Sequence, residues 1–410
     1  MPLDRIKNVL TAYLKDLEEK GMLKGKETVI TGIKPAQGDK GPRYLIEGYG
    51  EKEFLRMNAN NYLGMSLRKE VIEAEEKAVK EFGAGPGAVR FISGTYTPHV
   101  LLEKKLAEFH GKESAMIFSS AYSTVMGILT PMITQDTVVI SDELNHNCII
   151  NAIKLSRPKD KKIYKHNDMA GLKEMLESSI GNAKRVVIVT DGIFSMRGDN
   201  APLKEIADLA EKYNANFEEG ILTFVDDSHG VGAIGETGRG TTEYTHEDRI
   251  DVVIATLGKA LGVNGGYVAS SEEVIKFLRE TAPFYIYSNP ITPSEASAAL
   301  TSLEILDSDK GKTLLKHLHD MTMRFRSGLE DLGYEVIKGE HPIVPLMVRD
   351  TQKTTELAAY LKENGILATG LNFPVVPKGD QEIRFEICAD HTESDIDYAL
   401  QVLRKYKETH

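Results

Sequence analysis

A lysine in a glycine-rich segment is the residue of this chain best placed to do chemistry. Lys259 follows the apolar run at 252–256 and lies among four glycines of the segment 258–266. The run has the composition of a buried strand, and the glycines indicate a tight loop with little side-chain bulk. Because burial lowers the pKa of an amine, a lysine held there could be neutral and attack an aldehyde. An ordinary exposed lysine is the plain alternative, since most lysines face water.

A second apolar run ends in polar residues that would complement this lysine. Residues 222–225 lead into Asp226, Asp227, Ser228 and His229. A carboxylate at a strand end can bind a protonated pyridine nitrogen, and a histidine three residues later can hydrogen-bond a phenolic oxygen on the same ring. Pyridoxal 5′-phosphate (PLP) needs a lysine for its aldehyde, an acid for its ring nitrogen and donors for its phosphate. The two runs together therefore predict a PLP site, although the second run alone would also fit a capped turn.

The segment 116–127 can supply the phosphate donors. Its apolar start predicts a strand that ends near Phe118, and a helix is expected to follow the small residues after it. The first amides of a helix lie at the positive end of its dipole and bind anions. We assign the cofactor phosphate to Ser120, Ala121 and Tyr122, through their amides and a hydroxyl.

Motifs along nearly the whole chain resemble the α-oxoamine synthase family of PLP-dependent fold type I enzymes. They are NANNYLG at 58–64, VDDSHG at 225–230, GETGRG at 235–240, ATLGKALG at 255–262, GGY at 265–267 and CADHT at 388–392. These motifs are specific jointly rather than singly. The resemblance implies an α/β fold, with a mostly parallel seven-stranded sheet in a large domain and a smaller C-terminal α/β domain.

The resemblance also assigns roles to single residues. It implies that His146 stacks on the cofactor ring, that Ser195 joins His229 at the phenolic oxygen, and that Thr256 contacts the phosphate. Arg384 would bind the substrate carboxylate, as arginine does in a bidentate way, with Asn60 nearby. The plain alternatives are a helix-start histidine for His146, an edge-strand arginine facing water for Arg384 and an asparagine-rich turn for Asn60.

Two further features follow from the same comparison. Ser288 and Asn289 would reach the phosphate of a neighbouring subunit, so the active site would need a homodimer in which both sites form together. The family commonly has phenylalanine at the position of Tyr122 and an asparagine near Val125, and this departure leaves the detail of the phosphate contacts open. A Cys/His nucleophile at Cys148 is disfavoured, because no activating third group is visible.

The implied activity is that of a PLP-dependent acyl-CoA:amino acid C-acyltransferase. PVVPKG at 374–379 and ADHT at 389–392 favour the 2-amino-3-ketobutyrate CoA ligase branch, which joins glycine to acetyl-CoA and releases CoA. Lys259 would move the Cα proton while Asp226 keeps the ring nitrogen protonated. The alternative is a sister, decarboxylating branch, 8-amino-7-oxononanoate synthase-like or serine palmitoyltransferase-like, which takes alanine or serine and a longer acyl-CoA. An aminotransferase or lyase of the same fold and a non-catalytic PLP-binding protein are more distant alternatives.

The composition is consistent with a PLP-dependent enzyme and argues against several classes of binding partner. The chain has 410 residues and a net charge of −11, which disfavours nonspecific binding to nucleic acid. Its two cysteines form no zinc or disulfide pattern. No apolar run approaches the roughly 20 residues of a membrane span, and the amphipathic start at 1–22 lacks the apolar core of a signal peptide. We therefore expect a cytoplasmic enzyme without metal or membrane partners, whose N-terminal helix packs on its own subunit or on a partner.

Composition and pattern also suggest how the chain is divided. We expect an N-terminal helix and short strands over 1–57, a large PLP-binding domain over 58–295, and a small C-terminal domain over 296–410 that part of the N-terminal segment completes. In the small domain, 341–348, 366–379 and 382–387 have the pattern of strands, and a final helix follows from 393.

Overall fold

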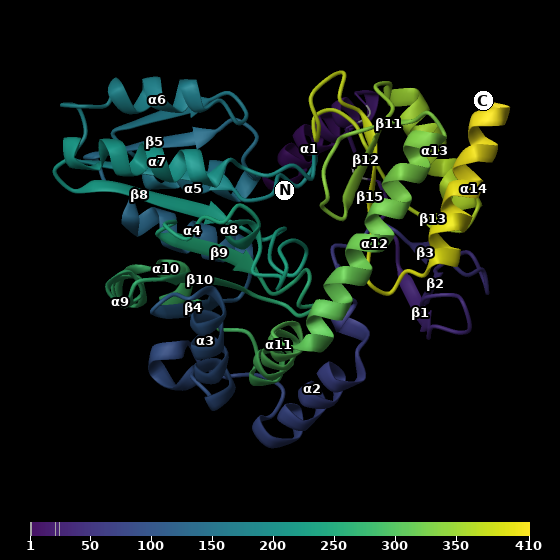
Figure 1. Cartoon of the computed structure of the whole chain (residues 1–410), viewed down its shortest axis with the longest axis horizontal. Coiled ribbons are helices and arrows are strands. Elements are labelled where there is room, and N and C mark those ends of the chain that lie inside the picture. Colours follow the sequence, from purple (N-terminus) through teal and green to yellow (C-terminus); the bar gives the residue numbers. More distant parts are fainter. Residues whose placement is uncertain (1, 21, 24) are drawn as a thin grey trace.

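The computed structural model describes residues 2–20, 22–23 and 25–410. Figure 1 shows two lobes, each built on a sheet, with the long helix α12 (Asp309–Asp331) leading from the larger lobe into the smaller one. How the chain divides into domains stays a prediction.

Within the described residues, the larger lobe is built on a seven-stranded sheet with the order β4-β10-β9-β8-β7-β5-β6. β10 is antiparallel to β4 and β9, and the remaining pairs are parallel. All residues of β5 and β10 are buried, as expected for strands covered on both faces. The predicted mostly parallel sheet is confirmed. Its strands are β4 (Ser114–Phe118), β5 (Thr137–Asp142), β6 (Asp160–Tyr164), β7 (Arg185–Asp191), β8 (Gly220–Asp226), β9 (Val252–Thr256) and β10 (Gly266–Ser270).

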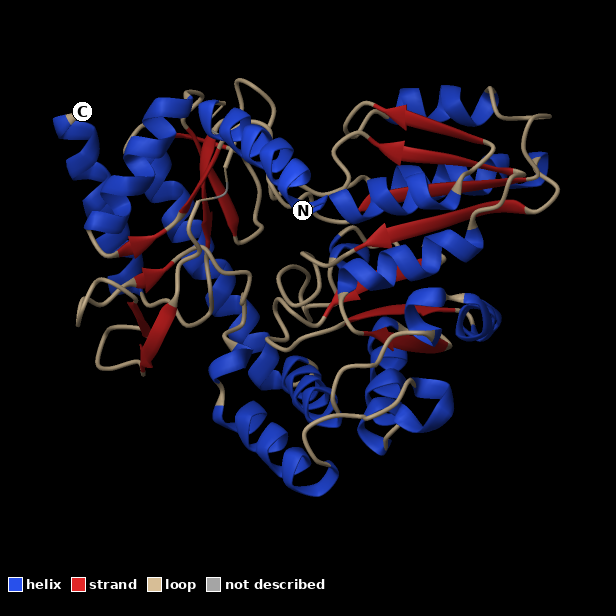
Figure 2. Ribbon diagram, turned by 180° about the vertical axis from the view of Figure 1, so that it is seen from behind, coloured by secondary structure: helices blue, strands red, loops and turns tan. Residues whose placement is uncertain are grey.

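Helices cover this sheet on both sides, as Figure 2 shows from behind. Val139 and its neighbours on one face pack against α4 (Ala121–Met132), α5 (Asn147–Ser156) and α9 (Glu272–Thr281). Val138 and its neighbours on the other face pack against α6 (Met169–Glu177) and α7 (Leu203–Tyr213). This lobe also contains α2 (Lys69–Phe82), α3 (Thr97–His110), α8 (Thr241–Tyr244), α10 (Pro283–Ile286) and α11 (Pro293–Leu306).

The smaller lobe contains an antiparallel sheet with the order β11-β12-β15-β14. Its neighbour β13 (Ile366–Leu367) pairs in parallel with β3 (Leu55–Arg56), so an N-terminal segment joins this lobe. Near the same segment, β1 (Ile30–Lys34) pairs with β2 (Arg43–Ile46). The remaining elements are β11 (Glu335–Val336), β12 (Ile343–Met347), β14 (Thr369–Leu371), β15 (Glu382–Glu386), α13 (Thr351–Glu363) and α14 (Glu393–Thr409).

One strand expectation in this lobe is wrong. The pattern predicted extended strand over 366–379, whereas β14 ends at Leu371 and the residues from 372 to 381 form turns and loop. Pro374 and Pro377 have no N–H to donate to a ladder, which explains why the apolar side chains there do not continue the strand.

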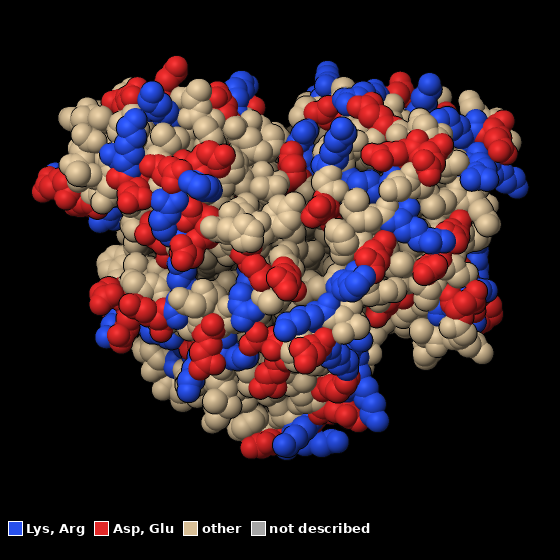
Figure 3. Space-filling model, in the orientation of Figure 1, with Lys and Arg blue, Asp and Glu red and all other residues tan. Residues whose placement is uncertain are grey.

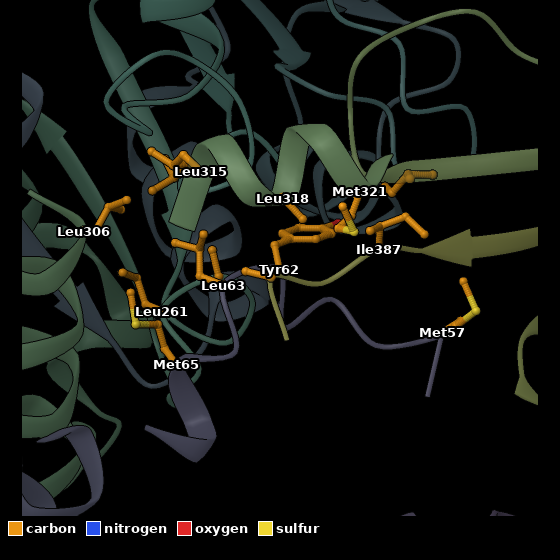
Figure 4. Close-up of a cluster of buried hydrophobic side chains, with 14 of the residues drawn as sticks. Met57, Tyr62, Leu63, Met65, Leu261, Leu306, Leu315, Leu318, Met321 and Ile387 are labelled. Carbon is orange, nitrogen blue, oxygen red and sulfur yellow. The ribbon is translucent and has the colours of Figure 1, made fainter. Parts of the chain in front are cut away.

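A buried cluster fixes the lysine-bearing loop against the start of the large lobe. Figure 4 shows Leu261, two residues after Lys259, beside Leu63, Met65 and Leu306. Gly262 has φ +70°, and a Cβ there would lie 2.5 Å from the amide nitrogen of Ser66. The glycine therefore permits both the left-handed turn and the close approach that this packing requires.

The N-terminal helix presents apolar side chains to solvent in this single chain. On α1 (Pro2–Glu19), six apolar residues are between 46% and 62% exposed: Leu3, Ile6, Val9, Leu10, Tyr13 and Leu14. Basic and acidic residues are interspersed over the face of the molecule that Figure 3 shows. Among the described helices, none is long and apolar enough to cross a membrane.

Candidate active site

The sheet brings the predicted acid and lysine to one edge. Asp226 ends β8, where its pairing partners are Asp191 on β7 and Ile254 on β9, and Lys259 follows three residues after β9 ends. The carboxyl ends of parallel strands form the ligand-binding edge of open α/β sheets. Two apolar runs that are distant in sequence therefore deliver their polar ends to the same place.

Lys259 is half-buried, and burial lowers the pKa of its amine to about 8, against the opposing effect of Asp226 and Asp191. A sizeable fraction of this amine is therefore neutral near physiological pH. Thr256 closes the loop that holds it: its hydroxyl donates to the carbonyl of Gly265 at 3.1 Å and accepts the amide of Gly258 at 3.0 Å. A contact from Thr256 to the phosphate stays a prediction.

The two adjacent aspartates occupy different surroundings. Asp226 Oδ1 accepts the amide of Ser228 at 3.1 Å, and its Oδ2 lies 3.8 Å from the thiol of Cys148. Asp227 is fully buried and accepts both the amide and the hydroxyl of Thr241, and burial raises the pKa of this carboxyl to about 7. Asp226 is therefore the acid available to a ligand, while Asp227 holds the loop that follows.

His146 is the N-cap of α5, as expected for a histidine at a helix start, and it also lies beside Asp191. Its stacking on the cofactor ring stays a prediction. Its amide donates to Asp191 Oδ2 at 2.9 Å, and its Nδ1 accepts the amide of Cys148 at 3.3 Å. The Cys148 sulfur lies 2.9 Å from the same nitrogen. Burial, reinforced by Asp226, raises the pKa of this thiol far above its ordinary value, so a thiolate nucleophile is disfavoured despite the nearby imidazole.

His229 is fixed by two residues that the motif did not single out. Its Nδ1 lies 2.7 Å from the hydroxyl of the fully buried Tyr62, which in turn lies 3.3 Å from Asn60 Oδ1. His341 Nε2 donates to the carbonyl of His229 at 2.8 Å. Burial lowers the pKa of His229 well below its ordinary value, so its ring is neutral. Its Nε2 hydrogen-bonds to none of the described residues and is the nitrogen left for a ligand.

Arg384 lies on the central strand β15, between β12 and β14, so it is not an edge-strand residue facing water. Its Nη1 donates to the carbonyl of Ser195 at 2.7 Å, and its Nη2 donates to Glu386 Oε1 at 2.6 Å. Its Nε is buried and has no partner among the described residues. Arg384, which the sequence predicts to bind the substrate carboxylate, therefore already forms an ion pair with the buried carboxyl group of Glu386.

The start of α4 has the properties of an anion site. Ser120 caps the helix, because its hydroxyl accepts the amide of Ser123 at 3.1 Å. The amides of Ala121 and Tyr122 donate to no residue in the described part of the chain, which leaves two donors at the positive end of a twelve-residue helix. The Tyr122 hydroxyl instead donates to Asn147 at 2.9 Å, so the tyrosine offers its amide rather than its side chain.

The residues predicted to serve a partner subunit lie in the loop after α10. Asn289 is exposed and Ser288 is half-buried, and the neighbouring Tyr287 is 79% exposed. Their proposed contact with a partner's phosphate stays a prediction.

The donor set of this site fits PLP. Free amides at α4 suit the phosphate, Asp226 Oδ2 suits the ring nitrogen, and the amine of Lys259 suits the aldehyde. The hydroxyl of Ser228 is buried without a partner among the described residues, so a further polar group is available beside Asp226. These residues would hold the cofactor between β8, β9 and α4.

Some residues of the site went unrecognised in the sequence. Asp191 ends an apolar run just as Asp226 does, and that signal could have identified it. Glu386 lies two residues after Arg384, a spacing that places both side chains on one face of a strand. Tyr62 and His341 gave no such local signal, because their contacts with His229 span 167 and 112 residues of chain.

Comparisons with known proteins identify the family to which this chain belongs. Residues 52–403 match the family aminotransferase class I and II. The 8-amino-7-oxononanoate synthase of Petrotoga mobilis is 40% identical over 399 residues, which cover 97% of this chain and 96% of that protein. The enzyme of the same name from Symbiobacterium thermophilum is 39% identical, with 91% and 92% covered. A solved structure of a serine palmitoyltransferase variant from S. paucimobilis with a bound PLP–myriocin aldimine has a TM-score of 0.87 at 26% identity, covering 98% of this chain and 97% of that one.

The matches extend over almost the entire chain and include both lobes. The fold is that of the PLP-dependent fold type I enzymes, and PLP is the cofactor. The matched family, the shared fold and the identity to these relatives lead to one assignment: this chain belongs to the aminotransferase class I and II family and, within it, is an α-oxoamine synthase.

Proposed function

We propose that this chain joins alanine to a seven-carbon dicarboxylic acyl thioester, with release of carbon dioxide and the free thiol. The observation that supports this most directly is the 40% identity, over nearly the whole chain, to a protein named 8-amino-7-oxononanoate synthase. In the product of that name, the two carbons at the amino end have the skeleton of alanine without its carboxyl group. The remaining seven carbons, from the ketone to the terminal carboxylate, are a heptanedioyl group.

The bonds of this reaction balance without an oxidant or reductant. One bond forms between the alanine Cα and the thioester carbon, and the carbon–sulfur bond breaks. The Cα–H bond of alanine breaks before the carbon–carbon bond forms, and the leaving thiolate takes up a proton to become the free thiol. The carboxyl group of alanine then leaves as carbon dioxide, and a proton adds to the Cα in its place. The sequence favoured glycine and acetyl-CoA as the substrates, whereas the relatives favour the decarboxylating alternative.

The residues of the site have separable tasks in this reaction. When bound, PLP provides a ring into which the negative charge at the amino-acid Cα can spread. Lys259, with a pKa near 8, is suited to take the Cα proton and return it. Arg384 is suited to bind the amino-acid carboxylate, and Asp226 to hold a proton at the ring nitrogen. Neutral His229, oriented by Tyr62 and His341, can donate to the phenolic oxygen.

We further propose a homodimer with shared active sites and a cytoplasmic location. The exposed apolar residues of α1 and the exposed loop at Tyr287 support the dimer, since both would be covered by a second copy. Cys148 and Cys388 are free and buried, which suits a reducing compartment.

The proposed reaction is tested by two products measured together. The PLP-loaded enzyme is incubated with alanine, glycine, serine or threonine, each combined with heptanedioyl-CoA, acetyl-CoA or palmitoyl-CoA. We expect the fastest CoA release with alanine and heptanedioyl-CoA, and one labelled carbon dioxide for each CoA when the alanine carboxyl is labelled. Fast release with glycine and acetyl-CoA, without carbon dioxide, would instead establish the ligase-like reaction. Preference for serine and palmitoyl-CoA would move the chain to the serine palmitoyltransferase-like branch.

The buried pair at Arg384 makes a separate prediction. A substrate carboxylate must share this arginine with Glu386, whose pKa is raised by burial. The substitution Glu386→Gln keeps the shape but removes the competing negative charge, so we expect the KM for the amino acid to fall by roughly 3- to 10-fold, or about 1 kcal/mol. Steady-state kinetics at saturating acyl thioester measure this change. A higher KM would show that Glu386 orients the arginine rather than competing for it.

A further inference from the structure

A cavity of about 410 Å³ lies beside Arg384, and of the groups assigned so far only Ser195 lines it. It opens where β5, β6 and β7 end and where the smaller lobe faces them. Ser195 belongs to its wall, and the carbonyl of Ser195 accepts a hydrogen bond from Arg384. The cavity therefore adjoins the place where the amino-acid carboxylate would bind, on the ligand-binding edge of the sheet.

Most of this wall is apolar. Side chains from both lobes contribute: Leu144, Phe194, Met196, Ile337, Met347, Val375 and Val376. A water-sized group occupies about 30 Å³, so the volume has room for a chain of seven carbons. The lining suits methylene groups, and it also contains two polar groups whose state is unusual.

The first is Glu382, which is only 2% exposed and whose Oε1 has no hydrogen-bond partner in the described part of the chain. Burial raises the pKa of this carboxyl to about 8, although Arg384 and Arg197 oppose the shift. The group is therefore mainly a neutral acid at pH 7, with an O–H that it can donate. An unpartnered buried polar atom of this kind costs free energy unless a ligand satisfies it.

The second is Arg197, which follows Ser195 and Met196 in the loop after β7. Its Nε donates to Asp199 Oδ2 at 2.8 Å, and its two Nη groups donate to none of the described residues. Other cations near the cavity are already paired: Lys165 binds Glu143 at 2.7 Å, and Arg349 binds both Glu335 and Asp380. Arg197 therefore keeps a free edge of its guanidinium in a wall that also presents a neutral carboxyl group.

We propose that this cavity takes the distal part of the acyl chain, and that Arg197 and Glu382 bind the carboxylate at its end. Guanidinium N–H groups and a carboxyl O–H are all donors, and a terminal carboxylate supplies the acceptors that they lack. The apolar wall between them and Ser195 would enclose the methylene groups. This inference rests on the proposed function, and it names the residues that would select a dicarboxylic over a monocarboxylic acyl thioester.

The test compares two acyl thioesters that differ only at the far end, heptanedioyl-CoA and heptanoyl-CoA. Kinetics are measured with alanine, and binding is measured by calorimetry without an amino acid, where no turnover occurs. For the wild-type enzyme we expect kcat/KM and affinity to favour heptanedioyl-CoA by roughly 10- to 100-fold, as for a charged hydrogen-bonding group. Arg197→Met should remove most of this preference by raising the KM for heptanedioyl-CoA, with little change for heptanoyl-CoA.

Two further variants make the result specific. Glu382→Gln keeps a neutral donor and should retain most of the preference, whereas Glu382→Leu should lose it. Lys165→Met removes an exposed cation beside the cavity that is not part of its lining, and it should behave like the wild type. Equal turnover of both thioesters by the wild type would overturn the carboxylate site while leaving the acyltransferase assignment intact. Preferential binding without turnover would support the site and refute the proposed reaction. Faster turnover of glutamate than alanine, lost in Arg197→Met, would place an amino-acid side chain there instead.

Discussion

Lys259→Ala should abolish CoA release, lowering kcat by at least about 1,000-fold at saturating substrates. The loss has two physical sources, because in the proposed reaction the same amine both holds the cofactor covalently and exchanges the proton at the amino-acid Cα. General acid–base catalysis alone contributes about 100- to 10,000-fold. The fold should survive, since the side-chain amine of Lys259 forms no hydrogen bond with the described residues, and the carbonyl that accepts the amide of Gly262 at 3.0 Å is kept in alanine. The nearby Leu261 provides the packing of the loop. Thermal denaturation and CoA release, measured on the same preparation, test both statements.

The pKa of Lys259 leads to a related prediction about the rate at which the protein captures PLP. With a pKa of about 8, the amine is mostly protonated at pH 6 and mostly neutral at pH 9. Only the neutral amine attacks an aldehyde, so the rate at which PLP is captured by the cofactor-free protein should rise about tenfold per pH unit below 8 and level off above it. Absorbance of the bound cofactor follows this rate without any turnover. A rate that still rises between pH 9 and 10 would show that burial does not lower this pKa.

The local sequence pattern was enough to predict which polar side chains lie at or just after the ends of strands. Lys259 and Asp226 each terminate an apolar run, and a parallel sheet gathers such ends at one edge, so their proximity could be expected without a structure. The free amides of α4 were predictable for a similar reason, because the first amides of any helix lack partners within it. For each of these residues, one short stretch of sequence determines both the secondary-structure element and the place of the residue within that element.

Contacts between distant segments were beyond such reasoning. Nothing near Tyr62 or His341 in sequence indicates that both meet His229. The pair of Arg384 and Glu386 is different, because their spacing of two residues on one strand was a local signal that went unrecognised. The prediction of a strand over 366–379 was wrong because it gave more weight to the apolar composition of the segment than to Pro374 and Pro377. The cavity that we propose for the acyl chain was equally hidden, because it is assembled from the ends of three strands and from the smaller lobe.

Asp226→Asn should lower kcat/KM by at least about 100-fold without unfolding the protein. Asparagine has the same shape, and its side-chain oxygen can still accept the amide of Ser228, so the loop should stay in place. The negative charge that would stabilise a protonated ring nitrogen is lost, and electrostatic groups aimed at developing charge are commonly worth two to three orders of magnitude. The enzyme should still bind PLP through Lys259, and its Tm should match that of the wild type.

Asp227→Asn is the matched control, because it makes the same chemical change one residue later. Asp227 accepts two hydrogen bonds from Thr241, and an asparagine keeps only one acceptor oxygen, so either the amide or the hydroxyl of Thr241 loses the acceptor for its buried hydrogen. A buried unsatisfied group costs about 1–3 kcal/mol, so this variant should have a lower Tm while the folded fraction keeps most of its kcat/KM. Asp226→Asn should therefore lower activity at an unchanged Tm, whereas Asp227→Asn should lower the Tm and leave most of the activity. If Asp227→Asn instead lost activity at an unchanged Tm, the acid that serves the cofactor would be Asp227, and the assignment made from the hydrogen bonds would be wrong.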